Sequence, residues 1–491
     1  MKNSVFTATV TAVALLASMA SAQTNITVAI QLEPPNLDPT GGAAQAIDSV
    51  LYSNVFEGLT RFEGDGAVVP GLAKSWDISN DGTVYTFNLN SGVLFHDGTS
   101  MDAEDVKFSL DRARSEESTN AQKGLFSGIT DVAVMNSTTV KVTLDQPNGS
   151  FLFNMAWGDA VIVAPESIDD IASNPIGTGA FAFSDWVQGD RLELVRNDSY
   201  WGTAAVLESA TFRFISDPTA AFAAVMAEDV DVFVGFPAPE NLPQFEADGR
   251  FQVLVGNTEG ETILSTNNKM PPFDNLLVRK AVAHAIDRQA IIDGAMFGYG
   301  TPIGTHFAPH NPDYVDLIGN SSYDPAKAKA LLVEAGFPEG FSTTLKLPPP
   351  SYARRGGEII ASQLRQVGIT AEISNLEWSQ WIEEVFKAKD FGLSIVSHTE
   401  PMDIGIYANP EYYFQYDNAV FQALMIELEA TTDPAGRSAL LAEAQTIISE
   451  DYVNGYLFEL AVATVAKADV RGLWVNQPTA AVDLTVVSWA D

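Results

Sequence analysis

Two adjacent arginines, Arg354 and Arg355, stand between a proline run and a glycine pair in the stretch PPPSYARRGG. A guanidinium can bind a carboxylate through two parallel hydrogen bonds. Charge-assisted bonds of this kind each contribute about 1.5–3 kcal/mol to the free energy of the interaction. The glycines at 356 and 357 are expected to leave backbone amides open near a helix start, where the helix dipole favours an anion. We predict that at least one arginine contacts an anionic ligand. The alternative, pairing with some of the chain's many acids, stays open.

A second polar group lies in the stretch SHTEPMD, which supplies Ser397, His398, Glu400 and Asp403. Imidazole and carboxylate together suit a metal ion, but they equally suit a loop that lines a pocket through hydrogen bonds. We favour the pocket. In EWSQWIEE, Trp378 and Trp381 are predicted to line the same pocket and to stack against the ligand. Their spacing of three residues fits two core residues equally well.

The motifs of catalysis and cofactor binding are missing from the sequence. No His-Glu-x-x-His helix is present, and Pro309 interrupts the interval between His306 and His310. There is no Gly-x-Ser-x-Gly, and GTGAF at 177–181 lacks the Gly-Lys-Ser/Thr ending of a phosphate loop. We therefore predict a protein with no catalytic residue, no metal and no cofactor.

Charge and composition indicate which kinds of partner and which compartment to expect. The 63 acids and 27 Lys plus Arg give a net charge of −36, with the acids scattered, which argues against nucleic acid as a partner. Residues 1–22 carry Lys2, an apolar run and a small-residue ending at Ala22, the pattern of a signal peptide. No later stretch offers about 18 uninterrupted apolar residues. With no cysteine for a disulfide or a lipid anchor, the exported product is expected in the periplasm.

Strand and helix patterns alternate along the chain. ITVAI at 26–30 and TVYTFNL at 83–89 predict strands. Asp102 is placed to cap a helix that carries Val106 and Leu110 on one face, and Asp274 precedes a second helical pattern that includes Val278 and Val282. A third helix is predicted from near Arg354 to Gly368. Such alternation favours an α/β protein.

Several blocks, in order, resemble the family-five extracellular solute-binding proteins, the peptide and nickel class that serves ABC importers. They are EPPNLDP, LAKSWDISNDGTVYTFNLNSGVLFHDGTSMDAEDVKFSLDRA, NPIGTGAFAFSDW, PPFDNLLVRKAVAHAIDR and YDPAKAKALLVEAGF. The resemblance implies a two-lobed periplasmic binding protein fold that closes on its ligand, with an extra subdomain in one lobe. The expected limits are lobe I at 23–57, 175–265 and 468–491, its subdomain at 58–174, and lobe II at 266–467.

The stretch ARRGGEIIASQLRQVGI resembles the dipeptide-binding branch, in which an arginine of a comparable segment holds the peptide carboxylate. Ser397 stands where that branch carries an aspartate for the ligand's α-ammonium, so Glu400 or Asp403 would have to replace it. The implied function is capture of short peptides or peptide-like carboxylates, without chemistry, and delivery to a permease in the inner membrane by a monomeric protein. An oligosaccharide, an opine or a nickel complex are alternative ligands, and an exported peptidase is the alternative of another class.

Overall fold

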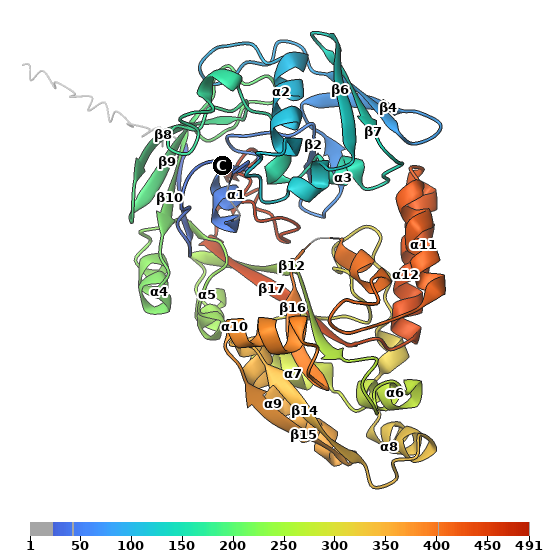
Figure 1. Ribbon diagram of the computed structural model, residues 1–491. Helices are drawn as coiled ribbons and strands as arrows, with labels where there is room; N and C mark the ends of the chain where they lie inside the picture. The colour runs from blue at the N-terminus through green and yellow to red at the C-terminus, as the bar shows by residue number, and fades with distance from the viewer. Residues whose placement is uncertain (1–22, 42–43, 401, 491) are drawn as a thin grey trace, which may run out of the picture.

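The computed structural model describes residues 23–41, 44–400 and 402–490, so the predicted signal peptide lies outside it. Two lobes of mixed helix and strand lie one above the other in Figure 1, with strands β12 and β17 passing between them. Among the described residues, no helix combines the length and apolar character needed to cross a membrane.

A single large sheet runs through both lobes in the order β15-β14-β16-β12-β17-β11-β1-β10-β9-β8. In the upper lobe, β1 (Asn25–Ile30) lies parallel to β10 (Ser209–Phe214) and β11 (Val232–Phe233), and β9 (Arg191–Arg196) and β8 (Phe181–Val187) continue the sheet antiparallel. The strand predicted at 26–30 is thus confirmed as β1. Helix α1 (Gln45–Leu51) packs its buried residues into the same core.

The two long strands β12 (Phe251–Thr266) and β17 (Gly455–Lys467) join the lobes. They pair antiparallel along most of their length, with a register shift between Asn257 and Glu261. In addition, β17 pairs with β11 of the upper lobe, and β12 pairs with β16 of the lower lobe. After β17 the chain returns to the upper lobe as the short pair β18 (Val470–Arg471) and β19 (Ser488–Trp489).

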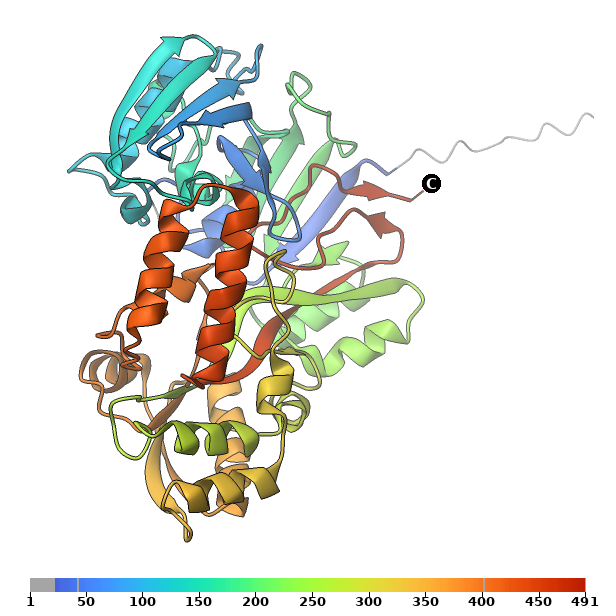
Figure 2. The same cartoon turned by 90° about the vertical axis from the view of Figure 1, so that its right-hand side faces the viewer.

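The lower lobe is built on the strands β14 (Phe341–Leu347), β15 (Ile369–Asn375) and β16 (Leu393–His398). Strand β14 lies parallel to both of its neighbours. The helices α6 (Leu276–His284), α7 (Arg288–Ala295), α8 (Pro325–Glu334) and α9 (Ser351–Gln366) share one core with these strands. A helical hairpin, α11 (Ala419–Ala430) and α12 (Pro434–Glu450), reaches towards the upper lobe (Figure 2).

A separate four-stranded sheet caps the upper lobe, in the order β4 (Ala73–Ile78), β5 (Val84–Leu89), β7 (Thr139–Leu144) and β6 (Ile129–Asn136). Helix α2 (Ala103–Arg114) covers it. The Asp102 carboxylate accepts the N–H of Glu104, and Asp105 accepts the N–H of Asp102, which completes a capping box. The predicted strand at 83–89 and the predicted helix after Asp102 are both confirmed.

The structure defines the starts of the other two predicted helices. Helix α6 follows Asp274 and is capped by Asn275, whose side chain accepts the N–H of Leu277. Helix α9 begins at Ser351, so Gly356 and Gly357 lie inside it and their amides bond within the helix. The prediction that these amides are open was wrong. A Cβ on Gly357 would lie 2.4 Å from a Leu347 methyl, so this glycine lets α9 pack on β14.

Candidate functional site

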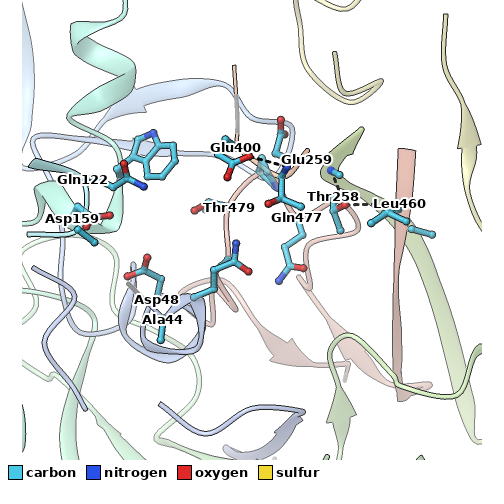
Figure 3. Close-up of a pocket in the computed structure, with 18 residues that line it drawn as sticks. Ala44, Asp48, Gln122, Asp159, Thr258, Glu259, Glu400, Leu460, Gln477 and Thr479 are labelled. Carbon is cyan, nitrogen blue, oxygen red and sulfur yellow. Dashed lines mark hydrogen bonds between the residues drawn. The ribbon is translucent and has the colours of Figure 1, made fainter. Parts of the chain in front are cut away.

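A cavity of about 440 Å³ opens between the lobes (Figure 3). Its upper wall comes from the start of α1, the segment 121–122, and the short helix η2 (Gly158–Ala160) with the residue before it. Strands β12 and β17, the segment 477–480, and the loop after β16 supply the rest. The charged side chains of the lining are Asp48, Asp159, Glu259 and Glu400. Among the described residues that line the cavity, none is Lys, Arg or His.

The upper wall carries a pair of aspartates beside a tryptophan. The Asp48 carboxylate lies against Gly158, because a Cβ built on that glycine would sit only 2.3 Å from Asp48 Oδ1. Gly158 lies between Trp157 and Asp159 in the chain, so the Asp48 carboxylate packs against the backbone that joins these two lining residues. Asp48 Oδ1, Asp159 Oδ1 and Trp157 Nε1 are buried, and within the described parts of the chain each lacks a hydrogen-bond partner.

The environment of the two aspartates disfavours their charged forms. Burial, together with the charge of Asp159, raises the pKa of Asp48 to about 8. Burial and the charge of Asp38 raise the pKa of Asp159 to about 6. The wall can therefore hold a proton or accept a cation, and in either case the carboxylate repulsion is relieved.

The opposite side of the cavity carries two glutamates. Figure 3 shows Glu259 and Glu400 across the open space from Asp48 and Asp159. Glu259 is buried and lies 2.6 Å from the ring of His310, and burial raises its pKa. Glu400 is exposed on the loop after β16 and accepts the N–H of Thr399.

Behind this loop, His306, His398 and Asp403 form a buried network. Asp403 Oδ1 lies 2.7 Å from His306 Nε2, and Asp403 Oδ2 lies 3.3 Å from His398 Nδ1. The remaining ring nitrogens meet the hydroxyls of Tyr407 and Tyr413, each at 3.1 Å. Although burial opposes ionisation, the two histidines hold the pKa of Asp403 below its usual range.

The same network has the donor set of a small metal site, since one atom from each of the three residues lies within 4.8 Å of the others. Each of these groups already has a hydrogen-bond partner, so the network as it stands is a structural support for the loop that carries Glu400. The absence of a resident metal stays a prediction.

The two arginines lie outside the cavity lining. Arg354 donates to the Leu376 carbonyl at 3.1 Å and pairs with Glu377 at 3.2 Å, with over a third of its side chain exposed. Arg355 is exposed, and its guanidinium lies 5.4 Å from the centre of the Phe297 ring. Their contact with a ligand stays a prediction.

Of the other predicted contacts, Glu400 alone lines the described cavity. Trp378 is 42% exposed, whereas Trp381 is buried and donates its indole N–H to Ser394. Ser397 is half-buried on β16, where its backbone N–H donates to the Tyr352 hydroxyl. His398 and Asp403 belong to the network behind the loop.

Sequence reasoning missed Asp48, Asp159 and Glu259, which are three of the four charged side chains of the lining, and it also missed Trp157. Asp48 and Asp159 come from elements 111 positions apart, and no local spacing connects them. Trp157-Gly158-Asp159, an aromatic and an acid on either side of a glycine, is a local pattern that could have drawn notice.

Comparisons with known proteins place the chain in a family. The model of "Bacterial extracellular solute-binding proteins, family 5 Middle" matches residues 67–446. The glutathione-binding protein GsiB of Salmonella paratyphi A is 29% identical over 483 residues, which is 94% of each chain. The structure of HbpA2 from Haemophilus parasuis superposes with a TM-score of 0.86 at 26% identity, over 95% of this chain and 100% of that one.

The periplasmic binding protein DppA of Helicobacter pylori, in complex with the peptide STSA, gives a TM-score of 0.72 at 24% identity, over 96% of this chain and 99% of that one. These likenesses confirm the predicted two-lobed α/β binding-protein fold. The chain therefore belongs to the bacterial extracellular solute-binding proteins of family 5.

Proposed function

We propose that this protein captures short peptides or peptide-like carboxylates in the cavity between its lobes and delivers them to an ABC permease in the inner membrane. The observation that carries the proposal is the cavity itself, whose lining comes from both lobes and from the strands that join them. A ligand that contacts both lobes stabilises their closed arrangement by its differential affinity for it. The relative named for glutathione, a γ-glutamyl peptide, supports a peptide-like ligand.

Location and mode of action form part of the same proposal. We place the protein in the periplasm as a monomer that binds its ligand without converting it and without a cofactor. The leader-like residues 1–22 and the binding proteins among its relatives support this assignment.

The limits of the lobes are also proposed, at 23–57, 175–265 and 468–491 for lobe I, 58–174 for its subdomain and 266–467 for lobe II. Separate apolar cores support this division. One core gathers residues of the four-stranded sheet and α2 between Leu59 and Ala164, and another gathers residues between Leu264 and Phe458.

Thermal unfolding of refolded, ligand-stripped protein with pooled dipeptides and tripeptides tests the function. A ligand at about 100 times its dissociation constant adds roughly 2.7 kcal/mol to the free energy of unfolding. We expect a clear rise in Tm with the peptide pool and none with an oligosaccharide pool. A protein that responds to no peptide is not a peptide-binding protein, and the proposal then fails.

A further inference from the structure

We propose that the cavity binds the amino-terminal residue of a peptide, with the ammonium between Asp48 and Asp159 and the adjoining carbonyl at the Trp157 indole. This inference rests on the proposed function, because it takes the cavity as the peptide site. It places amine recognition on lobe I, on the opposite side of the cavity from the loop at 397–403.

The first argument is the unmet hydrogen-bonding capacity of this wall. Asp159 is only 7% exposed, yet its Oδ1 has no partner among the residues that the structure describes, and Asp48 Oδ1 is in the same condition. A buried polar atom left unpaired costs about 1–3 kcal/mol, and more when it is charged. An ammonium carries three donors and no acceptor, so one such group can serve both aspartates.

The second argument is the complementary atom at Trp157. Its indole nitrogen is a donor only, it is buried, and nothing in the described chain accepts its proton. A ligand group that reaches this atom must therefore be a hydrogen-bond acceptor. The first residue of a peptide offers an acceptor close to its cationic group, because its ammonium and its carbonyl oxygen are attached to neighbouring carbons.

The third argument is the position of the Asp48 carboxylate against Gly158, the residue before Asp159. The Asp48 carboxylate occupies the space that a Cβ would take on this residue, so it approaches the backbone between Trp157 and Asp159. Helix α1 brings Asp48 to this point, and Figure 3 shows Asp48 and Asp159 beside the same open space.

Charge points the same way. Four carboxyl groups line the cavity, and in the described lining no basic side chain faces them. The guanidinium of Arg112, from α2, lies 3.5 Å from Asp38 and is thus already paired with an acid. A pair of carboxylates attracts positive charge, and here that charge must be carried by the ligand. Burial keeps the pKa of Asp48 near 8, and a bound ammonium would lower it.

The proposal also accounts for Ser397. Its side chain is a neutral hydroxyl that accepts from Thr262 at 3.3 Å, so it offers an ammonium no charge. With Asp48 and Asp159 on lobe I, the amine has a site that needs no carboxylate at position 397.

The test compares a pool of free dipeptides and tripeptides with the same pool after N-acetylation, by thermal shift and then by calorimetry on the best free peptide. We expect the free pool to raise Tm and the acetylated pool to bind at least tenfold more weakly. Asp159→Asn and Asp48→Asn should each weaken binding of the free peptide by about tenfold or more. They should leave the affinity for the acetylated peptide unchanged. Asp131→Asn, an exposed aspartate on β6, is the matched control.

The outcomes separate the inference from the function. If both pools bind equally well to wild type, or if both Asn variants hold the free peptide as wild type does, the amine site is wrong while the peptide function stands. If neither pool binds to wild type, the proposed function fails and this inference fails with it. Because Asn has nearly the size of Asp and removes the repulsion between the two carboxyl groups, both variants are expected to fold with a Tm at or above that of wild type.

Discussion

At the scale of single residues, glycines mark where segments approach one another more closely than a side chain would allow. GTGAF at 177–181 is such a segment: a Cβ on Gly177 would lie 1.9 Å from the Val55 carbonyl oxygen, and one on Gly179 would lie 2.2 Å from that of Asn54. The N–H of Gly179 donates to Val55, and that of Phe181 donates to Asn54. These glycines therefore serve backbone packing.

Gly177→Ala is expected to lower the free energy of unfolding by about 3 kcal/mol, at the upper end of the range for overpacking, because a carbonyl cannot move aside as a side chain can. Urea unfolding followed by circular dichroism measures the change. Gly124→Ala, where a Cβ would meet nothing within 4 Å, is the control and should change the stability little. An unchanged Gly177→Ala midpoint would contradict the close approach of these segments.

The arginines give a second residue-scale prediction. Arg354→Ala or Arg355→Ala should weaken binding of a peptide with a free carboxylate by about tenfold. The reason is that the two parallel hydrogen bonds from the guanidinium to the carboxylate are lost. Calorimetry measures the affinity, and Arg365→Ala, an exposed arginine further along α9, is the control. If both variants bind as wild type does, the arginines act only through the contacts seen here with Glu377 and Phe297.

At the scale of elements, the strands that join the lobes carry two buried glutamates. Glu261 of β12 and Glu459 of β17 are direct register partners, and they are 3% and 0% exposed. Burial, followed by the charges of neighbouring acids, raises the pKa of both well above the usual value. The folded chain thus holds protons there that the unfolded chain releases at lower pH.

The consequence is a slope of stability with pH. A carboxyl group whose pKa is raised by folding stabilises the protein below its unfolded pKa, near 4.3, and loses that contribution as pH rises through the folded pKa. We expect Tm to fall as pH rises above about 4.3, and Glu261→Gln to flatten this fall and raise Tm at pH 8. Calorimetric scans from pH 4 to 8 measure it, with exposed Glu372→Gln on β15 as the control. Equal slopes in Glu261→Gln and wild type would exclude this account.

At the scale of the whole molecule, two connections between the lobes flank the cavity. The strands β12 and β17 join them, and the α11–α12 hairpin contacts the subdomain, where the Gly149 N–H donates to the Glu429 carbonyl and Arg437 donates to Ser150 Oγ. The cavity between these connections has lining from both sides. A ligand that fills it can therefore draw the lobes together.

We expect the radius of gyration to fall when the protein is saturated with the best-binding peptide, because the closed arrangement gains the ligand's contacts with both lobes. Small-angle X-ray scattering of ligand-free and saturated protein measures the change. Asp159→Asn at the same peptide concentration should stay closer to the ligand-free value. Saturation without any change in radius would mean that the ligand binds to one lobe only.

Features that depend on neighbours along the chain could be predicted from the sequence. The capping box of Asp102 and Asp105, the strands β1 and β5, and the end of α9 at Gly368 rest on interactions within a few residues, so their patterns could be recognised directly. Ordered blocks along most of the chain also predicted the two-lobed fold, which the comparisons confirm.

The lining of the cavity and the partner of each charged group follow from the packing of distant segments. Asp48 meets the backbone of Trp157-Gly158-Asp159 because α1 and η2 pack together. His306 meets Asp403 because the segment after β13 (Thr301–Pro302) lies against the loop after β16. Arg354 finds Glu377 at the end of the following strand. Such contacts join residues 23 to 111 positions apart in the sequence. Strand pairing and core packing bring these residues together, so no spacing in the sequence predicts the contacts.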